Sequence, residues 1–114
     1  MLIEELLALL KNNPEQVEFQ HVIDSIDAHY HYQPAEFSNG TIVNEAGSNA
    51  GSCKIFAFAQ LNNLDELQTL ACFGCYYRDD VLQHPLANDH ANIRNFMVTG
   101  WKGIKFHSKA LTPK

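Results

Sequence analysis

Apolar residues recur at helical spacing through the N-terminal part of the chain. The leucine-rich segment 2–10 presents one broad apolar face, which predicts a short helix. Pro14, at a first helical position after the cap residue Asn13, predicts a second helix over about 14–30. The apolar stripe of this second helix contains Phe19, Val22, Ile23, Ile26 and Tyr30.

The pattern then changes to short extended segments around a turn. The Asn-Gly pair at 39–40 is a strong signal for a two-residue hairpin turn. We therefore expect a small hairpin with strands over about 35–38 and 41–44. Segment 103–107 alternates between apolar and polar residues, so it predicts a third strand beside that hairpin.

Three further helices are predicted in the second half of the chain. Segment 52–62 is apolar on most sides, which favours a central helix, and segments 65–83 and 89–99 follow it. Gly74 lies within the predicted helix 65–83 and indicates a close crossing by another element. Together the elements predict one compact α+β domain over residues 1–114, mostly helical, with a small two- or three-stranded antiparallel sheet.

Composition and charge exclude several classes of protein. A net charge of -5 disfavours general nucleic-acid binding, which depends on neutralising phosphates. The apolar runs are too short for a membrane span, and Glu4 and Glu5 stand where a secretory signal would carry basic residues. Three cysteines suit a reducing compartment, so we expect a cytoplasmic protein. The lysine-rich segment 101–114 predicts a solvated tail, and oligomeric state stays open.

The polar loop 44–54 is the first candidate for a binding site. It is rich in glycine, serine and asparagine and runs directly into a predicted helix. Unpaired N–H groups at such a junction attract anions, and arginines elsewhere can clamp an anion bidentately. We therefore predict binding of a small anionic ligand, or of a host or bacterial protein. The candidate ligand-binding residues are Asn44, Glu45, Gly47, Asn49, Gly51, Ser52, Lys54, Arg78 and Arg94.

Cys53 supplies an alternative function of a different class. It stands at the predicted helix start beside Lys54, and both features favour a thiolate. The alternative is a thiol-dependent acyl transferase or hydrolase in which Cys53 is the nucleophile. A buried structural cysteine is the competing interpretation. Candidates for the catalytic base and its orienting carboxylate are His29, His31, His90 and Asp27.

Two clusters have residue types that bind metals. Asp24, Asp27, His29 and His31 lie close in sequence, and Cys72 and Cys75 have the spacing of a Cys-x-x-Cys pair. On a helix Asp27 and His31 share a face while His29 points elsewhere, so the first set is incomplete. The cysteine pair has no second pair. We therefore predict no metal and no cofactor.

A set of short motifs is spread along most of the chain. It includes Asn44-Glu45-Ala46-Gly47, Gly51-Ser52-Cys53-Lys54, Cys72-Phe73-Gly74, Tyr76-Tyr77-Arg78 and Asn92-Ile93-Arg94-Asn95-Phe96. Over about residues 15–107 this set resembles the HopJ type III effector protein family. The resemblance implies a small bacterial domain and, by family name, an association with type III secretion by plant pathogens. It implies no particular activity, cofactor or catalytic residue.

Overall fold

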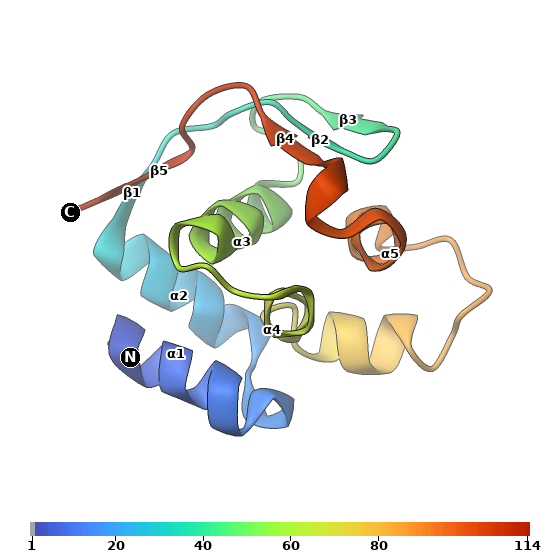
Figure 1. The fold of residues 1–114 in the computed structure, drawn as a ribbon, viewed down its shortest axis with the longest axis horizontal. Helices are drawn as coiled ribbons and strands as arrows, with labels where there is room; N and C mark the ends of the chain where they lie inside the picture. The colour runs from blue at the N-terminus through green and yellow to red at the C-terminus, as the bar shows by residue number, and fades with distance from the viewer. Residues whose placement is uncertain (1) are drawn as a thin grey trace.

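A computed structural model describes residues 2–114 and centres on helix α3 (Ala50–Leu61). Figure 1 shows α3 in the middle of the molecule, with the other helices around it and strands passing over it. Its side chains from Ile55 to Ala59 are all buried, together with Cys53. A helix that is apolar on nearly every side needs neighbours on every side, so α3 forms the centre of the core, as its sequence predicted.

The other helices lie around α3. Those of α type are α1 (Ile3–Asn12), α2 (Phe19–His29), α4 (Glu66–Ala71) and α5 (Ala91–Thr99). Of these, α2 and α4 pack directly against α3. Short helical turns of other types are the 3₁₀ turns η1 (Pro14–Gln16) and η3 (Gly100–Gly103) and the π-helical turn η2 (Tyr76–Val81). The single helix predicted over 14–30 is therefore a 3₁₀ turn followed by α2. Within the described part of the chain, no helix is both long and apolar enough to cross a bilayer.

The predicted hairpin and third strand form one antiparallel sheet. Strands β2 (Phe37–Asn39), β3 (Ile42–Asn44) and β4 (Ile104–Phe106) pair in the order β3-β2-β4. Phe37 pairs with Asn44 on one side and Phe106 on the other. The predicted α+β class with a three-stranded sheet is thus confirmed. The sheet matters for the site because it brings the end of β3 to the start of α3 (Figure 1).

A second sheet corrects the expectation for the C-terminus. Strand β1 (Tyr30–Tyr32) pairs antiparallel with β5 (Leu111–Pro113), so the expectation of a solvated tail is wrong. Leu111 is only 1% exposed, and the Lys114 amide donates to the His29 carbonyl. The pair joins residues from opposite parts of the chain, and no turn signal connects them in the sequence, which is why it was missed.

The helix predicted over 65–83 is interrupted at Gly74. Helix α4 ends at Ala71, and Gly74 has φ of +59°, a left-handed conformation that glycine adopts without strain. A Cβ at Gly74 would lie 2.6 Å from the backbone nitrogen of Phe19. The expected close crossing is therefore confirmed: glycine lets the chain between α4 and η2 touch the first turn of α2.

We predict that Gly74→Ala destabilises the protein by about 3 kcal/mol, because it combines left-handed strain with a backbone clash. Gly47→Ala is the matched control. Gly47 also has positive φ, +90°, but nothing lies within 4 Å of its added Cβ, so a loss of about 1 kcal/mol is expected. Urea unfolding measures the free energy of unfolding of both variants. Equal losses of stability would contradict the claim that the close approach to Phe19 requires glycine at position 74.

Candidate functional site

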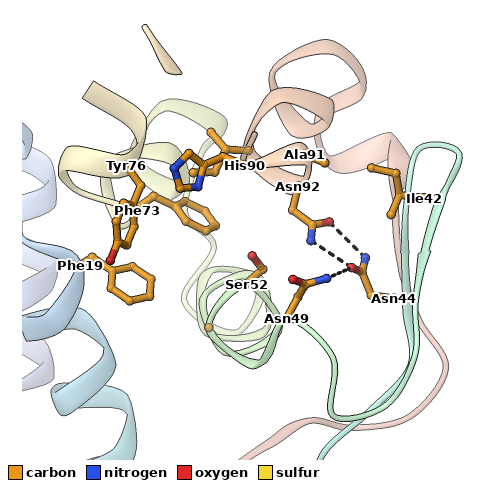
Figure 2. Close-up of a pocket in the computed structure, with 12 residues that line it drawn as sticks. Phe19, Ile42, Asn44, Asn49, Ser52, Phe73, Tyr76, His90, Ala91 and Asn92 are labelled. Atoms are coloured by element: carbon orange, nitrogen blue, oxygen red, sulfur yellow. Dashed lines mark hydrogen bonds between the residues drawn. The ribbon is translucent and has the colours of Figure 1, made fainter. Parts of the chain in front are cut away.

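A pocket of about 380 Å³ opens between the first turns of α3 and α5. Figure 2 shows it with Ser52 and Asn49 on the α3 side and Asn92 on the α5 side. Aromatic side chains from α2 and from the segment after α4 close another side. Small-molecule sites occupy roughly 300–1,000 Å³, so this pocket has room for a small ligand.

Both helices begin in the same unusual way. Their N-cap residues, Asn49 and His90, are left-handed, with φ of 52° and 50°, and neither side chain caps its helix. An ordinary N-cap is extended and accepts a hydrogen bond from an amide of the first turn. The amides of Gly51, Ser52 and Asn92 consequently have no acceptor within residues 2–114, although all three residues line the pocket.

A network of asparagine side chains holds the left-handed Asn49 at the start of α3. Asn49 Nδ2 donates to Asn44 Oδ1 at 2.7 Å, and Asn92 Nδ2 donates to the same oxygen at 3.0 Å. Asn44 Nδ2 returns a bond to Asn92 Oδ1 at 3.1 Å (Figure 2). Asn39 Nδ2 also reaches Asn92 Oδ1, at 3.0 Å. The network therefore fixes the end of β3 against the starts of α3 and α5.

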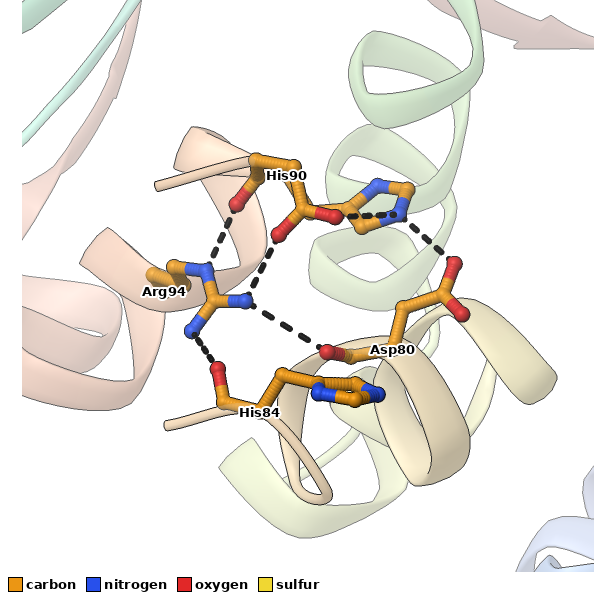
Figure 3. Close-up of polar contacts among 5 residues, drawn as sticks. Asp80, His84, His90 and Arg94 are labelled. Atoms are coloured by element: carbon orange, nitrogen blue, oxygen red, sulfur yellow. Dashed lines mark hydrogen bonds and ion pairs between the residues drawn. The ribbon is translucent and has the colours of Figure 1, made fainter. Parts of the chain in front are cut away.

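His90 is diverted from capping by a carboxylate. Its Nε2 lies 2.9 Å from Asp80 Oδ2 on η2, as Figure 3 shows. The ring of His90 is also tilted by 30° against that of Tyr76, with centroids 5.1 Å apart. The start of α5 is thus held by contacts that leave its first amides facing the pocket.

The aromatic side of the pocket is a row of rings. Tyr76 stands edge-on to Phe19, with centroids 5.0 Å apart and an interplanar angle of 64°, and it contacts His90 on its other side. Phe73 lies behind this row and is buried. A Cβ on Gly51 would lie 3.0 Å from Phe19 Cζ, so glycine at this position lets the Phe19 ring reach the first turn of α3.

Four of the predicted ligand-binding residues line the pocket: Asn44, Asn49, Gly51 and Ser52. Glu45 and Gly47 lie in the exposed turn just before α3, where the Ser48 amide donates to the Glu45 carbonyl. Neither of these two lines the pocket.

The predicted cationic residues bind within the protein instead. Lys54 Nζ lies 2.8 Å from Asp27 Oδ1 and 4.8 Å from the centroid of the Tyr32 ring. Arg78 donates to the carbonyl oxygens of Pro14 and Val17, at 3.3 and 2.7 Å, and so ties η2 to the chain before α2.

Arg94 is likewise occupied, as Figure 3 shows. Its guanidinium donates to the His84 carbonyl at 2.9 Å, the Asp89 carbonyl at 2.6 Å and Asp89 Oδ1 at 2.7 Å. The hydrogen bond from Arg94 lowers the pKa of Asp89. Arg94 therefore fastens the loop before α5, and neither arginine lines the pocket.

The environment of Cys53 does not favour the thiolate that the alternative function requires. The side chain is 1% exposed, and Sγ contacts the Ala35 carbonyl oxygen at 3.8 Å. Burial raises the pKa of the Cys53 thiol by more than the nearby Lys54 charge lowers it. His31 is exposed on β1, and the Asp27 carboxylate is bound to Lys54. This environment suits the competing interpretation, a cysteine that packs in the core.

The candidate metal clusters do not assemble. Helix α2 ends at His29, so Asp27 and His31 do not share the helical face that was expected. Cys72 is buried, which raises its pKa to about 12, whereas Cys75 is exposed. Over residues 2–114, no three His, Cys, Asp or Glu side chains are grouped to hold a metal ion.

Sequence reasoning missed the parts of the pocket that lie far from loop 44–54. Phe19 was assigned to the core stripe of its helix, and Tyr76 and Asn92 were given no binding role. The sequence position of Asn92 did offer one signal. An asparagine near a predicted helix start often forms hydrogen bonds to the backbone or to other side chains, so a polar role could have been predicted. Phe19 and Tyr76 gave no sequence signal for a binding role, because an aromatic residue in a predicted helix is usually a core residue.

We predict that iodoacetamide alkylates exposed Cys75 at least tenfold faster than Cys53 or Cys72, as followed by mass spectrometry at pH 7–8. Equal rates in urea provide the control. The raised pKa values also mean that the folded protein keeps these protons after unfolded thiols lose theirs, near about pH 8.5. Stability should therefore fall as pH rises above that value. Labelling of Cys53 as fast as Cys75 would contradict this assignment.

We predict that Asn92→Ala destabilises the protein by about 1–3 kcal/mol, because the Asn44 amide loses two hydrogen bonds and Asn39 Nδ2 keeps only its bond to the Asn92 carbonyl. Asn12→Ala, at the exposed end of α1, is the control and should change stability by less than about 0.5 kcal/mol. Thermal and urea unfolding measure both variants. A small loss for Asn92→Ala would show that the network does not fix the pocket.

The sequence and fold of this chain are shared with known proteins. A crystal structure titled as that of the unknown function protein VPA0580 is similar to it, with 54% sequence identity and a TM-score of 0.99. The alignment covers 100% of this chain and 95% of that one. No curated protein sequence matches the chain. Residues 3–111 match the HopJ type III effector protein family, to which this chain therefore belongs.

Proposed function

We propose that this HopJ-family protein binds a small anionic ligand in the pocket between α3 and α5. The observation that carries the proposal is the pair of helix starts, each without a side-chain cap, that line one pocket. The first amides of a helix are donors without intrahelical acceptors, and the helix dipole adds partial positive charge there. A carboxylate or phosphate oxygen can accept from such amides on both helices.

Side chains of the pocket support the same class of ligand. Ser52 is partly exposed, and its hydroxyl makes no hydrogen bond within residues 2–114, so it is available as a donor. No lysine or arginine lines the pocket, and His90 is paired with Asp80. Attraction therefore depends on amides and dipoles, each worth about 0.3–1 kcal/mol. We expect affinities for simple anions near the millimolar range.

A small ligand is favoured over a protein partner at this site. The pocket is concave, and its polar residues converge from β3, α3 and α5 on one place. Protein interfaces instead bury about 800 Å² on each partner and are much broader than such a pocket.

We predict that titration with acetate or inorganic phosphate shifts the amide NMR signals of Gly51, Ser52, Asn92 and Ile93, with one dissociation constant for both helices. Ser52→Asp should abolish these shifts, because it places a fixed carboxylate in the first turn of α3. It should also stabilise the protein by about 0.5–1 kcal/mol, since that position favours a negative charge.

Ser108→Asp is the matched control for charge, since Ser108 is exposed and lies outside this pocket. It should leave anion binding unchanged. Shifts that are spread over the lysines, or that persist in Ser52→Asp, would contradict the proposed site.

A further inference from the structure

We infer that the ligand of this pocket is an aromatic acid, that is, a planar ring carrying a carboxylate or a phosphate. The inference rests on the proposed anion site and goes further by naming what the acidic group is attached to. Its observations come from the opposite side of the pocket, where the rings of Phe19, Phe73 and Tyr76 replace polar groups.

The pocket has two chemically different sides. One side carries amide and hydroxyl groups of Asn44, Asn49 and Ser52 together with the two helix starts. The other carries the ring row in which Tyr76 contacts both Phe19 and His90. A ligand that matches both sides has an acidic group at one end and an apolar, flat body at the other. Aromatic pairs with ring centroids about 4.5–7 Å apart are favourable beyond the area they bury.

Tyr76 is the ring most open to a ligand. It is 38% exposed although it stands between two other rings, and its hydroxyl makes no hydrogen bond within the described residues. A ligand ring laid on Tyr76 would remove that exposed face from water.

The backbone that positions Tyr76 is itself unusual. Tyr76 opens η2, a π-helical turn in which the Leu82 amide bonds the Tyr77 carbonyl. The turn follows the left-handed Gly74, which contacts the backbone of Phe19. Single π turns occur frequently at functional sites. Here Asp80 of η2 contacts His90, and Tyr76 of the same turn contacts Phe19. The π-helical turn therefore contacts the rings at both ends of the row.

The volume of the pocket agrees with a ligand of this size. About 380 Å³ admits a single ring with an acidic group and leaves space for a further substituent or for water. The inorganic anions and acetate would fill only the polar side and leave the rings uncovered. The contribution of the ring to affinity can therefore be measured separately from the contribution of the acidic group.

The test compares four probes by NMR titration: benzoate, phenyl phosphate, cyclohexanecarboxylate and acetate. Benzoate or phenyl phosphate should bind about threefold to tenfold more tightly than cyclohexanecarboxylate, which has similar size but no π system. Acetate should bind most weakly. The preferred of the two aromatic acids then tells whether a carboxylate or a phosphate is the acidic group.

Two variants locate the ring contact. Tyr76→Leu should weaken benzoate binding about fivefold and leave acetate binding unchanged, because it removes the ring and not the amides. Tyr76→Phe keeps the ring and should bind benzoate as the unmodified protein does. Thermal unfolding confirms that both variants are folded, which their partly exposed position favours.

The outcomes separate this inference from the function on which it rests. If acetate and benzoate bind equally, or if Tyr76→Leu weakens both alike, the aromatic inference is overturned while the anion site stands. If no probe shifts Gly51, Ser52 or Asn92, the anion site itself is wrong. If benzyl alcohol binds as tightly as benzoate, the pocket selects rings without acids, and both the proposed function and the aromatic-acid inference fail.

Discussion

The hydrogen bonds between Asn44, Asn49 and Asn92 are the constraint on which the site depends. Three elements meet at these side chains, and Asn44 and Asn92 are buried. A buried amide without partners costs about 1–3 kcal/mol, so the side chains have little freedom to rearrange. By taking Asn49 away from the amides of α3, the network leaves the start of that helix open. One set of polar contacts thus both fixes the pocket and keeps its donors unoccupied.

At the start of α5, side-chain contacts likewise fix the backbone and leave the first amides unoccupied. The imidazole of His90 is held by Asp80, and Arg94 fastens the loop that leads into the helix. Neither interaction uses the first amides of α5. Both N-cap residues also have positive φ, which is uncommon for residues other than glycine and costs energy. Two similar departures from ordinary capping are thus directed at one pocket, and both support the proposed ligand site.

Local patterns predicted the parts of the fold that depend on neighbours in sequence. The central helix, the Asn-Gly hairpin and the third strand follow from periodicity and turn chemistry. The β1–β5 pair and the break at Gly74 do not, because their causes lie in contacts with distant residues. The site divides likewise. The part of the site at the start of α3 could be predicted from the glycine-rich loop. The contact between Asn92 and Asn44 could not, because the two residues are 48 positions apart in the sequence.

Helical geometry also explains why part of loop 44–54 lines the pocket and Cys53 does not. Successive residues of a helix point about 100° apart, so Cys53 lies about 200° around α3 from Gly51, which lines the pocket together with Ser52. Ser52 lines the pocket, and Cys53 packs into the core, where its amide already donates to the Asn49 carbonyl. The dipole that favours an anion beside Ser52 acts on a thiol only if the sulfur lies at the open end of the helix. The rotation that opens the amides of Gly51 and Ser52 to the pocket therefore turns the Cys53 sulfur away from it.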